Sequence, residues 1–531
     1  MRRSGARVSG YLRRLATTGA AYTAASILSK LIAVALLPLY TRHLETPDYG
    51  AAELLFAAVV TASIVVRLGL IESVLRFYYR DDEDPDRIVA ATFSGLFWLS
   101  TIGALIALPF ARPLAELVLD LHKPAELQTG TELTRIAIGG LWVLTMFEYL
   151  LTLYRLDERA RAYFVTTITN VLVTIGLTIV LVVGFEDGAR GLLVGSYASG
   201  AVFVAAMIFA QRRRLTLRVE VPLLRRLLRF GLPTMPAEVS LYLLNFADRL
   251  IITRSVGGRE GLAEAGLYSV GVKFAQAVNV LVRGFQLAWP PLAYSIRDDD
   301  EARRTYATVI TLFLAGCTWL VVGLWLLAIY LIGFFAAAEY HDAYEVVGLV
   351  AAGVTLYSLY MVMVVILGRT GRTEYNLPAA LAALVSNVVL NLILVPPLGI
   401  VGAGLALVAS YLVVIALMYW FTERLFPVPY EWLRLARILF AAAALIGLGE
   451  LVMPAAGFGG FVGRLFLALL YPLVLFGTGF FSAEERGWLA RLRHPRELAA
   501  SFAAIRARPA AVEGSPGELY EAERMDEDTL L

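Results

Sequence analysis

The sequence predicts an all-α polytopic membrane protein of about 14 transmembrane helices, in which two parallel six-helix repeats form two lobes and two further helices follow. Hydrophobic residues make up 59% of the chain and charged residues 17%, and the mean hydropathy of +0.69 is far above that of a soluble domain. Apolar runs of about 20 residues recur, which is the length that crosses a hydrocarbon core of about 30 Å. The period-two alternation of a membrane barrel does not occur, so the spans are expected to be helices.

The apolar runs give the positions of the spans in order. The first half is expected to cross the membrane at residues 17–40, 50–75, 88–110, 133–154, 162–184 and 189–211. The second half is expected to cross at residues 231–253, 265–292, 307–335, 343–367, 375–398 and 401–422. Two more spans follow at residues 434–454 and 461–481.

Short similar segments, separated by nearly the same number of residues, indicate an internal repeat. YTR at 40–42 returns as ITR at 252–254, and Tyr163 returns as Tyr375, both 212 residues on. GARGLLVGSYAS is matched by GIVGAGLALVAS after 211 residues. Six spans return the chain to the same side of the membrane, so the repeats are parallel and a site is expected where the halves meet.

Four regions follow from the spans and the repeat. We expect an N-terminal lobe at 1–215, a C-terminal lobe at 216–430 and two extra helices at 431–482. Residues 483–531 are expected to form a basic amphipathic helix and an acidic, disordered tail on the cytoplasmic side.

The placement of arginine predicts the orientation. Basic turns at 155–161, 211–230 and 368–374 alternate with loops at 336–345 and 396–399 that contain no Lys or Arg. By the positive-inside rule both termini are cytoplasmic and the protein lies in the cytoplasmic (inner) membrane. The apolar run behind the basic N-terminus is too long for a cleaved signal peptide, so we expect it to be retained.

Polar and charged residues inside the predicted spans are the candidate site. Residues 268–289 carry a stripe in which polar side chains advance by three or four residues, as on one face of a helix. An ionised side chain at the bilayer centre costs about 2.5–3.5 kcal/mol, so these residues must face a watery cavity or one another. The candidate substrate-binding residues are Lys30, Arg67, Asn245, Arg249, Lys273, Gln276, Asn279 and Arg283.

Two interpretations of these charges stay open. Glu53, Glu148, Glu238 and Asp248 lie at matching depths and can pair with the cations. Most of the charges fall on the first, second, seventh and eighth spans, the equivalent helices of the two halves, and this favours a substrate cavity on the seam. Glu148, Glu238 and Asp248 are also candidates for binding a coupling H⁺ or Na⁺.

Other classes of site find little support in the sequence. The chain has one cysteine, Cys317, and four scattered histidines, so we predict no metal site and no cofactor. No phosphate-binding glycine loop is present, which argues against an ATPase, and we predict no catalytic residues and no nucleic-acid partner.

Two segments resemble one known family. SILSKLIAVALLPLYTRHLETPDYGAAELLFAAVV with RLGLIESVLRFYY, and FGLPTMPAEVSLYLLNFADRLIITRSVG with AGLYSVGVKFA, are similar to the polysaccharide-transporter (O-antigen or oligosaccharide lipid flippase) family. That family belongs to the multidrug, oligosaccharidyl-lipid and polysaccharide exporter superfamily. The arginine-rich first helix of the related peptidoglycan-precursor flippases is not seen here.

The resemblance implies a function and partners. It implies twelve core helices in two lobes and alternating access that moves a polyprenyl-pyrophosphate-linked oligosaccharide from the inner to the outer leaflet. Glycosyltransferases or a polymerase of the same pathway are implied partners. Cations on a cavity wall would replace the hydration of the pyrophosphate.

Three alternatives remain beside the flippase. A drug or cation antiporter of the same superfamily would favour net negative charge in its cavity. A membrane glycosyltransferase or ligase would need a larger outer loop than TRHLETPDYG. A purely structural scaffold would leave the intramembrane cations unexplained.

Overall fold

The computed structural model describes residues 28, 32, 34–79, 84–482 and 485–486. Within these residues every regular element is a helix, as predicted, and no strand is present. Most of the predicted first span lies outside the described residues, as does the candidate Lys30. Nearly all of the region 483–531, expected to be cytoplasmic, also lies outside them.

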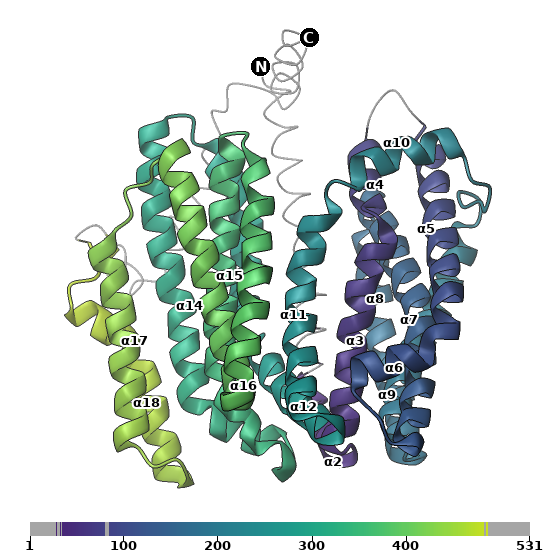
Figure 1. Ribbon diagram of the computed structural model, residues 1–531. Coiled ribbons are helices and arrows are strands. Elements are labelled where there is room, and N and C mark those ends of the chain that lie inside the picture. The colour runs from purple at the N-terminus through teal and green to yellow at the C-terminus, as the bar shows by residue number, and fades with distance from the viewer. Residues whose placement is uncertain (1–27, 29–31, 33, 80–83, 483–484, 487–531) are drawn as a thin grey trace. The chain divides into compact units, whose positions relative to one another are not determined.

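Within the described residues, the first half contains nine α-helices, one 3-10 helix and a π-helical turn (Figure 1). They are α2 (Leu37–His43), α3 (Thr46–Arg67), α4 (Leu70–Phe77), α5 (Pro85–Ala107), η1 (Leu108–Phe110), α6 (Ala111–Leu119), α7 (Pro124–Leu156), α8 (Ala160–Ile179), η2 (Val180–Gly184), α9 (Gly188–Gln211) and α10 (Val221–Gly231).

The second half and the extra helices continue the all-helical pattern. They are α11 (Met235–Val256), α12 (Gly258–Ala275), α13 (Val278–Ser295), α14 (Asp299–Phe335), η3 (Ala338–Ala343), α15 (Tyr344–Arg369), η4 (Thr373–Tyr375), α16 (Asn376–Leu425), α17 (Trp432–Val452) and α18 (Gly457–Gly477).

Membrane-spanning helices are confirmed, whereas the count of fourteen stays a prediction. Among the described residues, ten helices are long and apolar enough to cross a membrane, or eleven if the bent pair α12–α13 is one span. α16 contains two of the predicted spans, and the chain reverses between them at Gly399, whose φ of 55° and ψ of −136° are not helical. Two prolines, Pro396 and Pro397, precede this turn.

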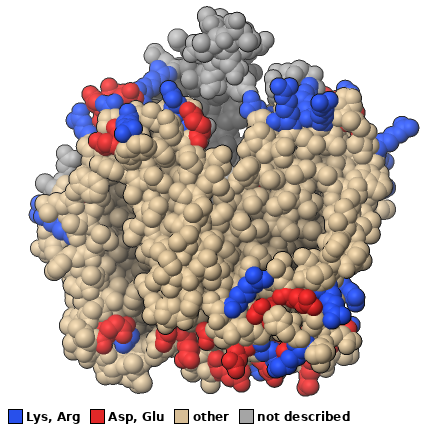
Figure 2. Space-filling model, in the orientation of Figure 1, with Lys and Arg blue, Asp and Glu red and all other residues tan. Residues whose placement is uncertain are grey.

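The helices have two distinct ends. α4 and α10 lie at one, which we call the α10 end, and α2, α6 and α12 lie at the other, the α12 end (Figure 1). On the face seen in Figure 2, most Lys, Arg, Asp and Glu side chains gather toward these two ends, and a broad belt that is nearly free of charged residues separates them. This distribution is the one expected of a protein whose middle faces lipid.

The two halves meet where α3 crosses α12, close to the α12 end. A Cβ on Gly50 would lie 1.8 Å from the carbonyl oxygen of Leu262, and a Cβ on Gly266 would lie 2.6 Å from that of Thr46. The two backbones therefore touch, which only small residues at the crossing allow.

Polar contacts at the same end join the halves further. The Tyr340 hydroxyl donates to the Leu44 carbonyl at 2.9 Å, and the Ala337 amide donates to Thr41 Oγ1 at 3.1 Å. Arg259 donates to Glu45 Oε2 at 2.7 Å. The halves are thus held together through α2, α3 and α12.

The segment before α11 packs on the first half. α10 buries Leu223 and Leu227 and contacts α4 and α5. Ser73 Oγ donates to the Leu227 carbonyl at 2.7 Å, and Gly69, at a φ of 69°, lies against the backbone of Gly231. The predicted lobe boundary at residues 215/216 remains a prediction.

We predict that Gly50→Ala separates α3 from α12 and lowers the free energy of unfolding by about 1–3 kcal/mol, because the new methyl meets backbone that cannot rotate away. Thermal unfolding in detergent, followed by tryptophan fluorescence, measures the change. Gly139→Ala on α7 is the matched control, since nothing lies within 4 Å of its Cβ. Equal melting temperatures for the two variants would contradict the crossing described here.

Candidate functional site

The polar stripe of residues 268–289 does not lie on one straight helix, so that part of the prediction is wrong. The helix breaks between Ala275 and Val278, and α12 and the following helix are bent by 50°. At the break the Ala277 amide donates to the Phe274 carbonyl, three residues back, instead of four. Lys273, before the break, and Gln276, directly after α12, reach different cavities. Tyr268 and Val272, also before the break, line the same cavity as Gln276.

Gln276, Asn279 and Arg283 take part in lining a polar cavity of about 310 Å³, which we call the second-half cavity. Asn245, Gln276, Asn279 and Arg283, four of the predicted substrate residues, come together here. Asn279 Nδ2 donates to Gln276 Oε1 and Arg283 Nη1 to Gln286 Oε1 at 3.5 Å. The remaining lining residues are Tyr242, Tyr268, Val272, Val350, Val354, Tyr357, Leu407 and Tyr411.

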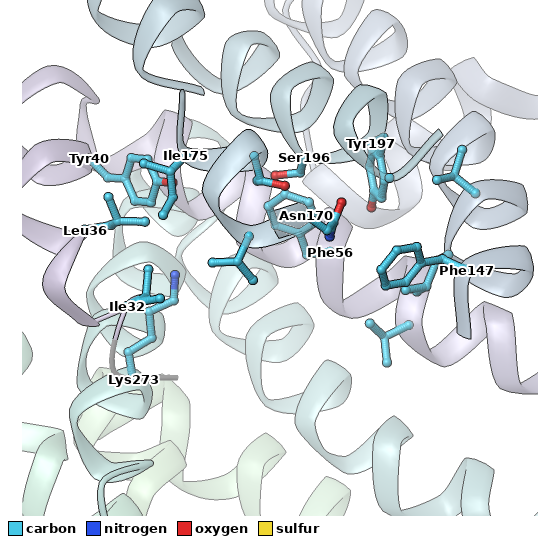
Figure 3. A pocket seen from close by; sticks show the side chains of 16 residues that line it. Ile32, Leu36, Tyr40, Phe56, Phe147, Asn170, Ile175, Ser196, Tyr197 and Lys273 are labelled. Carbon is cyan, nitrogen blue, oxygen red and sulfur yellow. The ribbon is translucent and has the colours of Figure 1, made fainter. Parts of the chain in front are cut away.

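Lys273, before the break, reaches a different and mainly apolar cavity of about 380 Å³, the first-half cavity. In the view of Figure 3, Lys273 lies at one side of this cavity and Phe147 and Tyr197 lie at the other. The residues that line it are Ile32, Leu36, Tyr40, Phe56, Val60, Val143, Leu144, Phe147, Asn170, Val171, Thr174, Ile175, Ser196, Tyr197, Gly200 and Lys273.

Lys273 also forms an ion pair between the two halves. Its Nζ lies 2.6 Å from Glu53 Oε1 on α3 and 5.0 Å from the centre of the Tyr49 ring. Both charged side chains are mostly buried, so the pair offsets the cost of placing each charge in an apolar region. The expectation that acids on the second span can pair with these cations is met here.

Arg67 forms a second pair, nearer the α10 end. It binds Glu148 on α7, and its Nε donates to the Ser63 carbonyl at 3.2 Å. Glu238, at the start of α11, is partly buried within electrostatic range of both residues. Arg67 therefore joins α3 to α7 and lines neither cavity.

Asp248 and Arg249 belong to a buried network in the second half. Asp248 is 1% exposed and accepts hydrogen bonds from the Tyr268 hydroxyl and from Asn391 Nδ2, both at 2.8 Å. Arg249 donates to Ser269 Oγ and to the Asn245 carbonyl, each at 2.9 Å. Helices α11, α12 and α16 are joined by these bonds.

Two further groups were not anticipated from the sequence. Tyr268, Tyr357 and Tyr411 lie on the wall of the second-half cavity. A tyrosine inside an apolar span is itself a signal, because its hydroxyl favours a partner or a wet surface. Arg464 on α18 is 4% exposed and binds Glu450 on α17, with Nη2 and Oε2 3.1 Å apart.

Among the residues that the structure describes, no group of three or more His, Cys, Asp or Glu side chains is placed so that it could hold a metal ion.

Solved structures with the same fold are transport proteins. The lipid II flippase MurJ in an inward closed conformation gives a TM-score of 0.69 at 11% identity, over 86% of this chain and 98% of that one. An inward-facing multidrug resistance MATE family transporter of the MOP superfamily gives 0.60 at 17%, over 75% and 94%. A MOP superfamily transporter from Pyrococcus furiosus gives 0.55 at 17%, over 78% and 94%. The chain is a multi-pass helical membrane protein with their fold.

Residues 39–345, more than half of the chain, match the family described as "Polysaccharide biosynthesis protein", and the chain belongs to that family. No curated protein matches it by sequence. The family resemblance expected from the sequence is confirmed.

We predict that Lys273 and Glu53 are energetically coupled. Lys273→Met and Glu53→Gln should each destabilise the protein, because each leaves the other polar group unpaired, and the double variant should lose less than the sum. The expected coupling is about 0.5–3 kcal/mol, measured as a double-mutant cycle of unfolding free energies.

The exposed pair Arg112–Glu116 on α6, 3.6 Å apart, is the matched control and should show a coupling of about 0.5 kcal/mol or less. Additive effects at Lys273 and Glu53 would argue that the inter-half ion pair is not formed.

Proposed function

We propose that the protein is a flippase that moves a polyprenyl-pyrophosphate-linked oligosaccharide from the inner to the outer leaflet of the cytoplasmic membrane by alternating access. The observation that carries the proposal is the second-half cavity, where Arg283 stands among Asn245, Gln276, Asn279 and four tyrosines. A sugar needs many hydrogen-bonding partners and a pyrophosphate needs a cation, and this wall offers the partners and one arginine.

Lys273 and Arg67 extend the cationic path. Each is held by a carboxylate, Lys273 by Glu53 and Arg67 by Glu148. An anionic headgroup that enters would compete with these carboxylates and take over one or both cations. The free energy of desolvating the headgroup is then offset by charges that are already inside the protein.

An orientation and a state follow from the proposal. The arginine-rich segment 211–230 belongs to the α10 end, so we assign this end to the cytoplasm. Both termini are assigned to the cytoplasm from the placement of arginine in the sequence alone. The contacts between the halves described above gather at the α12 end, which would be the outer end. The structure thus fits a state that is closed toward the outside.

Asp248 is the best candidate for a coupling ion, H⁺ or Na⁺. Its buried carboxylate lies beside Asn387 and Asn391, whose side-chain oxygens accept no hydrogen bond from the described residues. Oxygen ligands are those that hard cations prefer. Glu148 is already engaged by Arg67, and Glu238 lies closer to the α10 end.

An ion-coupled drug or cation antiporter is the second candidate. The ion pairs at Lys273 and Arg67 favour it, because they cancel two of the intramembrane positive charges. Neither proposal assigns an enzymatic step to the chain. Glycosyltransferases or a polymerase of the same pathway are the partners that a flippase would have.

We predict that Lys273→Gln with Arg283→Gln abolishes glycolipid binding and export, because both cations that reach the cavities are removed. Mass spectrometry of the lipids that co-purify with each variant measures binding. Arg112→Gln with Lys123→Gln removes two exposed cations outside the site and should change nothing.

A polyprenyl-pyrophosphate glycan bound to the wild type and the control, but lost from the site variant of equal melting temperature, is the expected result. If no such lipid binds the wild type, and organic cations do, the antiporter replaces the flippase.

A further inference from the structure

The two cavities differ in chemistry in a way that suits two parts of one amphiphile. We propose that the first-half cavity binds the hydrocarbon chain of the cargo next to its anionic headgroup, while the second-half cavity binds the sugars. This inference rests on the proposed function and adds a ligand site for the lipid chain.

Most of the side chains that line the first-half cavity are apolar. Nine of its sixteen lining residues are aliphatic or phenylalanine. Two polar side chains on its wall already form hydrogen bonds within the protein. Ser196 Oγ donates to the Leu192 carbonyl at 2.9 Å, and Asn170 Oδ1 accepts from Ser199 Oγ at 3.0 Å. A glycan would find few partners here, whereas an isoprenoid chain would bury apolar surface.

The single charge on the wall selects the kind of amphiphile. Among the described residues that line this cavity, only Lys273 is charged, and it is positive. An anionic headgroup can compete with Glu53 for the Lys273 Nζ, and no residue of the wall offers a cationic headgroup a carboxylate in the same way.

The broken helix places the headgroup between the two cavities. Lys273 lies in the last turn of α12 and faces the first-half cavity, while Gln276 and Asn279, directly after, face the second-half cavity. A pyrophosphate at Lys273 can therefore have its chain on one side and its sugars on the other. One linear amphiphile requires this order of apolar, anionic and polar groups.

The first-half cavity is also close to the apolar surface. Val171 and Thr174 of α8 line it, while Leu172 and Val173 of the same helix are 56% and 40% exposed. One helix thus separates the cavity from the face that lipid covers. A hydrocarbon chain in the bilayer therefore has a short route into the first-half cavity.

Photolabelling of the full-length protein in nanodiscs tests the proposal. The probe is a short-chain prenyl pyrophosphate with a diazirine on its last isoprene unit, and the labelled peptides are identified by mass spectrometry. We expect the label on α7, α8 and α9 around residues 143–147, 170–175 and 196–200. Ser196→Phe, which fills the cavity, should reduce it about tenfold, the change that 1.4 kcal/mol of lost binding produces.

Val202→Phe is the matched control, because Val202 lies on the same helix and is 64% exposed. Val143→Phe fills the cavity from α7 and serves as a second blocking variant if Ser196→Phe does not fold. Lys273→Gln should weaken labelling by the pyrophosphate probe and leave labelling by the matching prenyl alcohol unchanged.

Label on α17 and α18 or on the outer face of α8, or equal label in the blocking variants and the control, overturns the inference. The proposed flippase function would still stand after that result if the glycolipid co-purifies with the wild type. Label in the cavity without any co-purifying glycolipid would instead uphold the chain site and count against the glycan cargo.

Discussion

The cost of holding charge in an apolar region is the constraint on which the rest of this structure depends. The four candidate-site cations that the structure describes each have a specific partner: a carboxylate for Lys273 and Arg67, backbone and side-chain oxygens for Arg249, and Gln286 for Arg283. These bonds do more than neutralise charge, because they join particular helices. The Lys273–Glu53 pair joins the halves, and Arg249 joins α11 to α12.

The same bonds suggest how substrate and conformation are connected. Lys273 is shared between a cavity wall and the contact of the two halves, where Gly50 and Gly266 bring the backbones together. An anion that took Lys273 from Glu53 would weaken that contact. In the proposed mechanism, binding therefore favours opening at the α12 end, and only the differential affinity for the two states drives the change.

The sequence was sufficient for the helices and for most of the polar residues that meet in the second-half cavity. Apolar runs of the right length predicted the spans, including the pair that the structure merges into α16, because hydropathy is a local property. Asn245, Gln276, Asn279 and Arg283 were found because polar side chains on an apolar helix have few alternatives to a cavity.

The break at residues 276–277 could not be seen in the same way. No proline or glycine marks it, and a three-to-four-residue spacing looks the same on a straight helix and on one that bends. Pairing was also beyond the sequence: Arg67 binds Glu148 and Lys273 binds Glu53 because of how distant helices pack. The different chemistry of the two cavities, in halves that share sequence echoes, likewise depends on tertiary contacts.

The central claim is that these cations carry an anionic headgroup across the bilayer. Flipping in proteoliposomes, compared between a polyprenyl-pyrophosphate-linked glycan and a neutral glycolipid with the same chain and sugars, tests it most directly. The account predicts protein-dependent flipping of the pyrophosphate-linked glycan and little of the neutral one. Equal flipping of both lipids would contradict it, because the cations would then have no part in selecting the cargo.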